Sequence, residues 1–257
     1  MLERLCALAI DAGLAIRAIA ATSFDQPAKS DGSPVTKADL AADRIIVEGL
    51  AKIAPQVPVV SEESADFSKA PGDLFFLVDP LDGTTNFVMG VPYFATSIAL
   101  ARDGAVVVGV VFNPVTGDLY TARKGAGALL NGAPVEVDAS ASLAAALLGS
   151  SYGADEGHMA DGIRVLKALS SSVRKVAVRF SPALDLCNIA RGRMHGYVDN
   201  GTTPEDHAAA ALILAEAGGT VQDYGATDWD IRRPGVIAAS NKVLADTLQQ
   251  IVRDATS

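Results

Sequence analysis

The segment LVDPLDGTTNF, residues 77–87, places two carboxylates, Asp79 and Asp82, directly after an apolar run. Pro80 fixes one backbone angle between them and Gly83 permits a sharp reversal, so both side chains can face one point. Two carboxylates that share a site repel each other unless a cation lies between them, and Mg²⁺ is a hard ion that takes such oxygen ligands. Asp-Pro and Asp-Gly are also ordinary turn dipeptides, so the segment alone fits either a turn or a metal site.

The residues after Asp82 could bind an anion. If Gly83, Thr84 and Thr85 open a helix, their free backbone N–H groups suit a phosphate. The formal net charge of −9 opposes such a ligand unless a cation offsets it. The same charge disfavours a nucleic-acid polymer or an anionic membrane surface as the main partner.

Three more acidic positions bear on a cation site. Glu62, with Glu63 beside it, follows a short apolar strand, whereas Asp39 and Asp206 fall in the first turn of predicted helices. A carboxylate in a first turn offsets the helix dipole, and this explanation is sufficient for either aspartate alone. All these positions nevertheless lie at a strand end or a helix start, where α/β proteins build their sites.

The elements that must position these residues follow from periodicity and from turn and cap residues. Strands are predicted at 73–79, 94–114 (a hairpin that turns at Asp103-Gly104), 117–137 (with a turn at Asn131-Gly132), 174–180, 194–199 and 235–240. Helices are predicted at 2–20, from the N-cap Thr36 to about residue 54, and at 157–170, 181–193, 203–216 and 241–257. An antiparallel meander followed by alternating helices and strands predicts a layered α/β (α+β) sandwich. We expect one compact unit of two halves, residues 1–140 and 141–257.

Composition places the chain among compact globular proteins. Of its 257 residues, 49% are hydrophobic and 20% charged, and apolar runs are too short for a membrane span. Charged residues interrupt the apolar N-terminal segment, which therefore resembles an amphipathic helix more than a signal peptide. Two cysteines, Cys6 and Cys187, give no disulfide framework. These features predict a cytoplasmic protein.

Four motifs, in order, resemble those of the inositol monophosphatase-like, lithium-sensitive, Mg²⁺-dependent phosphatases. DPLDGTTNF, from residue 79, resembles the family's metal-binding signature DP(I/L)DGT, and SEES, from residue 61, resembles its upstream glutamate motif. SPVTKAD, residues 33–39, is similar to the segment that supplies an aspartate near the attacking water. EDHAAAALILAEAGGTV, from residue 205, resembles the C-terminal signature, and the resemblance covers nearly the whole chain.

The resemblance implies an αβαβα sandwich and assigns roles to individual residues. The metal ligands would be Glu62, Asp79, Asp82, Asp206 and the backbone carbonyl of Leu81. The catalytic residues would be Asp39, Glu62 and Thr84, of which Asp39 and Thr84 orient the nucleophilic water. The substrate-binding residues would be Asp82, Gly83, Thr84, Thr85, Ser181, Asp199 and Asp206.

The resemblance also implies an activity: hydrolysis of a small phosphorylated polyol, with inositol monophosphate as the expected substrate, by a lithium-sensitive homodimer that holds two or three Mg²⁺ per site. Alternatives within the superfamily are a 3′(2′),5′-bisphosphate nucleotidase, a histidinol-phosphatase and a fructose-1,6-bisphosphatase. A sensor that binds a phosphorylated metabolite without turnover is the non-enzymatic alternative.

Three residues depart from the family pattern. Glu205 occupies the position of the usual tryptophan before the C-terminal aspartate, and Phe180 and Pro182 replace small residues around Ser181. KSDGSPVTKADLAAD, residues 29–43, is close to the nucleotidase branch, whereas the segment after Gly83 resembles the inositol monophosphatase branch. These departures bear on the substrate and leave the predicted metal ligands intact.

Overall fold

A computed structural model describes residues 1–20, 36–63, 72–153 and 155–257. The helices are α1 (Leu2–Ala20), α2 (Lys37–Ile53), α3 (Thr84–Val88), α4 (Glu156–Ser172), α5 (Pro182–Ala190), α6 (Pro204–Glu216) and α7 (Lys242–Thr256), with a short 3₁₀ turn at Leu143–Ala145. The strands of the first sheet are β1 (Val59–Ser61), β2 (Leu74–Asp82), β3 (Ala95–Arg102), β4 (Ala105–Asn113), β5 (Asp118–Arg123), β6 (Ala128–Leu130) and β7 (Ala133–Pro134). The strands of the second sheet are β8 (Leu147–Ser151), β9 (Lys175–Ala177), β10 (Gly196–Asp199), β11 (Thr220–Asp223) and β12 (Val236–Ala239).

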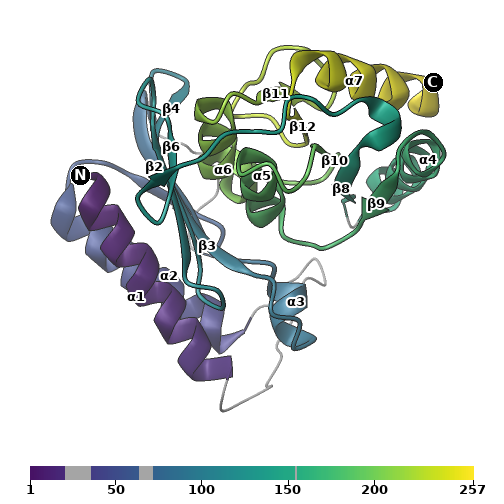
Figure 1. The fold of residues 1–257 in the computed structure, drawn as a ribbon. Helices are drawn as coiled ribbons and strands as arrows, with labels where there is room; N and C mark the ends of the chain where they lie inside the picture. Colours follow the sequence, from purple (N-terminus) through teal and green to yellow (C-terminus); the bar gives the residue numbers. More distant parts are fainter. Residues whose placement is uncertain (21–35, 64–71, 154) are drawn as a thin grey trace.

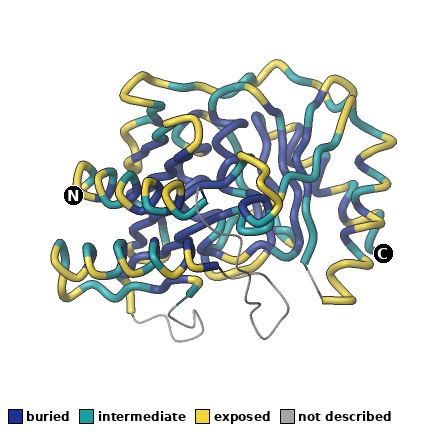
Figure 2. The backbone as a smooth tube through the Cα atoms, turned by 90° about the horizontal axis from the view of Figure 1, so that it is seen from below, coloured by how far each residue is buried: buried dark blue, intermediate teal, exposed yellow. Residues whose placement is uncertain are grey.

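The elements stack in five layers, α, β, α, β, α, as predicted (Figure 1). Helices α1 and α2 cover the outer face of the first sheet, and α5 and α6 lie between the two sheets. Helices α4 and α7 cover the far face of the second sheet. The buried backbone therefore runs through the middle of the molecule, and exposed residues gather on the outer helices (Figure 2).

The first sheet keeps its strands in chain order, and only β1 and β2 run parallel. The hairpin turn at Asp103-Gly104 and the two-residue turn at Asn131-Gly132 form as predicted, with positive φ at all four residues. This conformation suits the right-handed twist of the flanking strands. The second sheet has the order β11-β12-β10-β8-β9, with β8 parallel to both of its neighbours.

Helix α6 is buried on all sides over residues 207–214, because it packs between the two sheets. Its alanine run, residues 208–211, is fully buried, and its small side chains let the backbone approach β4 closely. A Cβ added to Gly109 of β4 would lie 2.6 Å from the carbonyl oxygen of Ala209. This close approach sets where the first turn of α6 lies.

Several predicted boundaries were wrong. Strands β8 and β11 were not predicted, because LLGSS lacks the β-branched and aromatic residues typical of strands and TVQD is only four residues long. The strand predicted at 174–180 is only β9, since Phe180 adopts a left-handed conformation and the chain turns into α5. The helix predicted at 181–193 ends at Ala190, just before Gly192 with φ of 71°.

The division of the chain at residue 140 into two halves stays a prediction. Residues 33–35 of the SPVTKAD motif and Ser64 of SEES lie outside the described residues. In the part of the chain that the structure describes, no helix combines the length and apolar character needed to cross a membrane.

The close contact between β4 and α6 predicts a stability effect. Gly109→Ala should lower the free energy of unfolding by about 1–3 kcal/mol, because the new methyl group meets backbone atoms of Ala209 that cannot move independently. The measurement is urea unfolding followed by circular dichroism. The control is Gly157→Ala on α4, where a Cβ would come no closer than 3.5 Å to Asp155. Equal stability of the two variants would contradict the prediction.

Candidate active site

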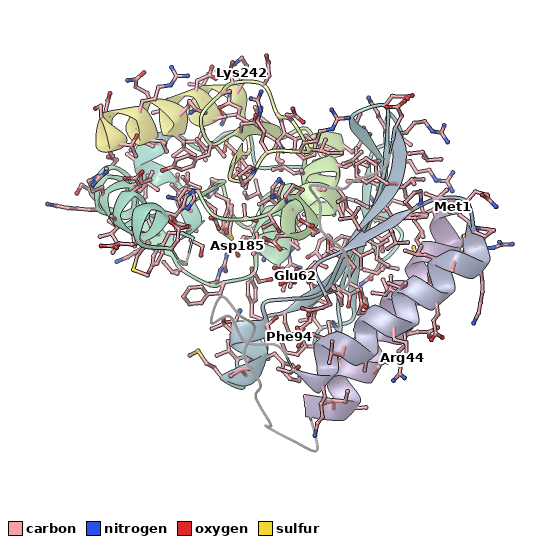
Figure 3. The ribbon with its side chains drawn as sticks, turned by 180° about the vertical axis from the view of Figure 1, so that it is seen from behind. Met1, Arg44, Glu62, Phe94, Asp185 and Lys242 are labelled. Carbon is pink, nitrogen blue, oxygen red and sulfur yellow. The ribbon has the colours of Figure 1, made fainter. Side chains whose placement is uncertain are left out.

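A pocket of about 290 Å³ opens where the first sheet meets the C-terminal part of the chain. Figure 3 labels Glu62 at this junction and Asp185 on the C-terminal side of it. The first part of the chain contributes Glu62, Asp79, Leu81, Asp82, Gly83, Thr84 and Thr85. The second part contributes Ser151, Tyr152, Gly153, Phe180, Pro182, Asp199, Gly201, Thr202 and Asp206. Every predicted site residue except Asp39 and Ser181 lines this pocket, and those two donate or accept hydrogen bonds just behind it.

Three predicted metal ligands converge in the pocket. One carboxylate oxygen from each of Glu62, Asp79 and Asp206 lies within 4.8 Å of the others. Parallel pairing of β1 with β2 sets Ser61 opposite Val78, so the residues that follow them, Glu62 and Asp79, are neighbours. Asp206 reaches the same point from the first turn of α6.

Asp79 and Asp82 both lie within strand β2. The sequence had predicted that the strand ends at Asp79 and that Asp82 follows in a turn. Strand β2 continues to Asp82, and its register with β3 shifts between the two aspartates. The backbone N–H of Leu81 donates to Asp79 Oδ1 over 2.9 Å. The irregularity lets both carboxylates face the pocket although they are three residues apart, which a regular strand would not allow.

Burial and repulsion by neighbouring carboxylates oppose ionisation of Asp79 and Asp206. Asp79 is only 2% exposed, and burial together with the nearby Glu62 and Asp82 carboxylates raises its pKa well above the usual value. Burial and Glu62 raise the pKa of Asp206 to about 7. A cation bound among these oxygens would remove the repulsion. The donor set, made of carboxylates alone, fits a hard divalent ion.

Asp82 lies in the same pocket but outside the group of three converging oxygens. Its Oδ2 accepts a hydrogen bond from Ser181 Oγ and another, over 3.1 Å, from the backbone N–H of Ala183. Burial is the main reason that its pKa is raised. These contacts tie β2 to the start of α5. The role of Asp82 as a metal ligand stays a prediction.

The two oxygens of Asp39 perform different tasks. Oδ2 accepts from the backbone N–H of Thr36 over 2.7 Å, which completes the predicted capping box of α2. Oδ1 accepts from Thr84 Oγ1 over 3.0 Å. The Thr84 hydroxyl also lies 3.0 Å from the carbonyl oxygen of Leu81. Because a hydroxyl has one proton, these two acceptors compete for it, and the Thr84 oxygen keeps lone pairs that can accept from water.

Asp199 holds the loop that leads into α6. Its Oδ1 accepts from the backbone N–H groups of Gly201 and Thr202, and its Oδ2 accepts from the Tyr197 hydroxyl over 2.7 Å. Burial raises its pKa. Asp199 lines the pocket, but its predicted contact with substrate hydroxyls stays a prediction.

Sequence reasoning missed the pocket wall formed by Ser151, Tyr152 and Gly153, because β8 was not predicted. Ser151 pairs with Asp199 in the parallel ladder, so both strands deliver their next residues to the same edge. A Cβ added to Gly201 would lie 2.2 Å from the Cα atom of Gly153. Two glycines at corresponding places after two strands are the signal that could have indicated this contact.

The protein is an α/β protein of the five-layer sandwich class with an acidic pocket between its two sheets. Comparison with known proteins identifies the family within this class. The family model described as inositol monophosphatase family matches residues 1–257, so the chain belongs to this family. It is 36% identical over 226 residues to an inositol-1-monophosphatase of Mesorhizobium japonicum, covering 88% of this chain and 85% of that one. It is 35% identical over 231 residues to the Nus factor SuhB of Vibrio cholerae, covering 89% of this chain and 86% of that one.

Solved structures agree with this assignment. An inositol monophosphatase from Anabaena (Nostoc) superimposes with a TM-score of 0.87 at 29% identity, covering 98% of this chain and 95% of that one. The extragenic suppressor protein suhB from Bartonella henselae superimposes with a TM-score of 0.89 at 31% identity, covering 98% of this chain and 97% of that one. Both matches span the two sheets and the pocket between them.

Because the carboxylates repel one another, the predicted metal ligand Asp79 should destabilise the folded protein when no cation is bound. In excess chelator, Asp79→Asn should raise the free energy of unfolding by roughly 1–3 kcal/mol, because a neutral amide replaces a buried carboxylate that faces two others. Urea unfolding measures the effect. Asp254→Asn, at an exposed position on α7, is the control and should change little. A destabilised Asp79→Asn variant would show that repulsion does not dominate.

The raised pKa of Asp206 predicts a pH dependence in the absence of divalent ions. Between its ordinary value of 3.8 and about 7, the folded state binds a proton that the unfolded state lacks. Stability is therefore greatest at the acidic end of that range, is lost as the pH rises towards 7, and changes little above it. In chelator, the urea midpoint should fall between about pH 5 and about pH 7 and level off at higher pH. Asp206→Asn should flatten this slope, and an unchanged slope would contradict the assignment.

Proposed function

We propose that the protein is a Mg²⁺-dependent phosphomonoesterase that hydrolyses a small phosphorylated polyol, with inositol monophosphate as the expected substrate. The observation that carries the proposal is the convergence of Glu62, Asp79 and Asp206, from three different elements, within 4.8 Å. Membership of the inositol monophosphatase family supports the same activity.

The carboxylate cluster is the proposed binding site for two or three Mg²⁺ ions. Glu62, Asp79 and Asp206 would supply the shared oxygens, with Asp82 and the Leu81 carbonyl as further ligands. Divalent cations held there would lower the pKa of a bound water and neutralise phosphate oxygens in the transition state. The filled site would attract phosphate despite the net charge of −9.

The remaining residues would position the reactants. Asp39 holds the Thr84 hydroxyl, and we propose that this pair orients the attacking water. The backbone N–H groups of Gly83, Thr84 and Thr85 would hold the phosphate as α3 begins. Ser181 keeps Asp82 in place, and Asp199 would contact hydroxyls of the substrate. We propose direct in-line attack by water without a phosphoenzyme.

The size of the pocket supports a small metabolite as substrate. A volume of about 290 Å³ accommodates a phosphorylated ring or a short polyol, but not a polymer.

We propose a homodimer in the cytoplasm on family resemblance, and lithium inhibition on the same ground. Several relatives carry the name Nus factor SuhB, and we propose the phosphatase activity for this chain because the pocket and the carboxylate cluster support it.

The test is phosphate release from inositol monophosphate with and without Mg²⁺. Activity should require the ion, and Asp79→Asn should lower kcat/KM by roughly 100-fold or more without unfolding the protein, because a buried ligand is lost. Asp254→Asn is again the control. Full activity in excess chelator would overturn the proposal.

A substrate panel separates the alternatives. We expect inositol monophosphate to have the highest kcat/KM, ahead of adenosine 3′,5′-bisphosphate, histidinol phosphate and fructose 1,6-bisphosphate. A different order of kcat/KM values would identify another phosphate ester as the substrate and would leave the proposed reaction, phosphomonoester hydrolysis, unchanged. Tight metabolite binding without turnover at saturating Mg²⁺ would instead indicate a sensor.

A further inference from the structure

Phe180 has an unusual conformation at the edge of the pocket. It lies in the short connection between β9 and α5 and lines the pocket, and its φ is 49°. This is the left-handed region, which a bulky residue rarely adopts. Phe180 is also 41% exposed, although phenylalanine normally buries its ring. A strained, exposed aromatic residue at a pocket calls for an explanation other than packing.

Contacts of the preceding residue hold this conformation from one side. The carbonyl oxygen of Arg179 accepts a hydrogen bond from Asn86 Nδ2 over 2.6 Å, and the same amide group donates to the carbonyl oxygen of Tyr93 over 2.7 Å. Asn86 belongs to α3, so the connection is attached to the helix that begins at the predicted phosphate site.

The Arg179 side chain adds a second attachment. Its guanidinium group lies 2.7 Å from Asp185 Oδ1, and the Tyr93 hydroxyl donates to the same oxygen over 2.5 Å. The side chain of Asp185 is fully buried. The guanidinium carbon lies 4.9 Å from the centre of the Tyr93 ring, a cation–π contact. Arg179 is therefore held by charge, hydrogen bonding and stacking together.

The residues after Phe180 are fixed as well. Ser181 donates to Asp82, and Pro182 begins α5 with its restricted backbone angle. The carbonyl oxygen of Phe180 faces Gly83, where an added Cβ would lie 3.3 Å away. The surroundings thus determine the backbone on both sides of Phe180, while its ring remains exposed to solvent. Such strain is characteristic of sites where a residue acts on a ligand.

The composition of the pocket indicates what that ligand group is. Carboxylates, hydroxyls and backbone N–H groups surround the predicted metal and phosphate positions, and a phosphate gains nothing from a phenyl ring beside it. Phe180 and Pro182 form an apolar wall on the α5 side of the same pocket. An apolar wall matches the part of a substrate that carries the phosphate, provided that this part has a flat face.

We propose that Phe180 is a specificity-determining residue that selects phosphate esters of ring-shaped leaving groups by stacking against the ring face. This inference rests on the proposed function and narrows it: cyclic polyols, sugars and nucleosides offer such a face, whereas an acyclic polyol does not. The conformation that Arg179, Asp185 and Ser181 impose keeps the phenyl ring at the pocket and out of the core.

The experiment compares kcat/KM for inositol 1-phosphate with kcat/KM for glycerol 2-phosphate, with the whole chain and Mg²⁺. Phe180→Gly removes the ring and accepts the left-handed backbone without strain, so we expect it to fold. The ratio of the two values should fall about tenfold, chiefly through the KM of inositol 1-phosphate. Phe180→Tyr keeps the ring and should restore the ratio. Adenosine 2′-monophosphate, run in parallel, shows whether an aromatic ring stacks better than an alicyclic one.

Asp103→Gly is the matched control, because it also places glycine at a left-handed residue, in a hairpin turn that does not line the pocket. It should leave the substrate ratio unchanged. An unchanged ratio in Phe180→Gly, or an equal change for cyclic and acyclic esters, would overturn the inference while the phosphatase activity stands. Lack of phosphate release from every ester by the wild-type protein would instead overturn the proposed function.

Discussion

The repulsion among clustered carboxylates is the constraint on which the rest of this structure depends. Glu62, Asp79 and Asp206 come from separate elements and meet in the pocket, where Asp79 is buried and Glu62 remains exposed. Without a cation, burial and the neighbouring carboxylates raise the pKa of Asp79 and of Asp206, and this repulsion opposes folding. The fold must therefore supply enough packing and hydrogen bonding elsewhere to keep these elements together, and both sheets with α6 between them perform this task.

Helix α6 links the packing of the protein to its site. Its alanine-rich middle is buried between the sheets, so its position follows from close contact with β4. Its first turn carries Asp206 into the pocket, with Oδ2 accepting hydrogen bonds from the Thr203 backbone N–H and the Thr202 hydroxyl. These hydrogen bonds restrict the rotation of the Asp206 side chain, so the scaffold would orient a cation ligand in advance.

Asp39 shows the same double use, since one oxygen caps α2 and the other holds Thr84. The helix cap of Asp39 is therefore compatible with the water-orienting role that we propose for it with Thr84. The opposite side of the pocket differs, because Phe180 is neither buried nor relaxed. Polar residues line the end of the pocket where we propose that phosphate binds, and the connection before α5 lines the end that we propose faces the leaving group.

The sequence by itself determined the layered fold and the order of most elements, because periodicity, caps and two-residue turns are local patterns. Local patterns left the acidic residues open between turn, cap and metal site, and the family resemblance of four motifs in order selected Glu62, Asp79 and Asp206. Strands β8 and β11 were not predicted from the sequence, because LLGSS and TVQD become strands only through pairing with other segments of the chain. The irregular register at Asp79 and Asp82, the wall at Gly153 and Gly201, and the fixed conformation of Phe180 were decided by the tertiary structure alone. Each of these depends on contacts between residues far apart in the chain, which no local pattern encodes.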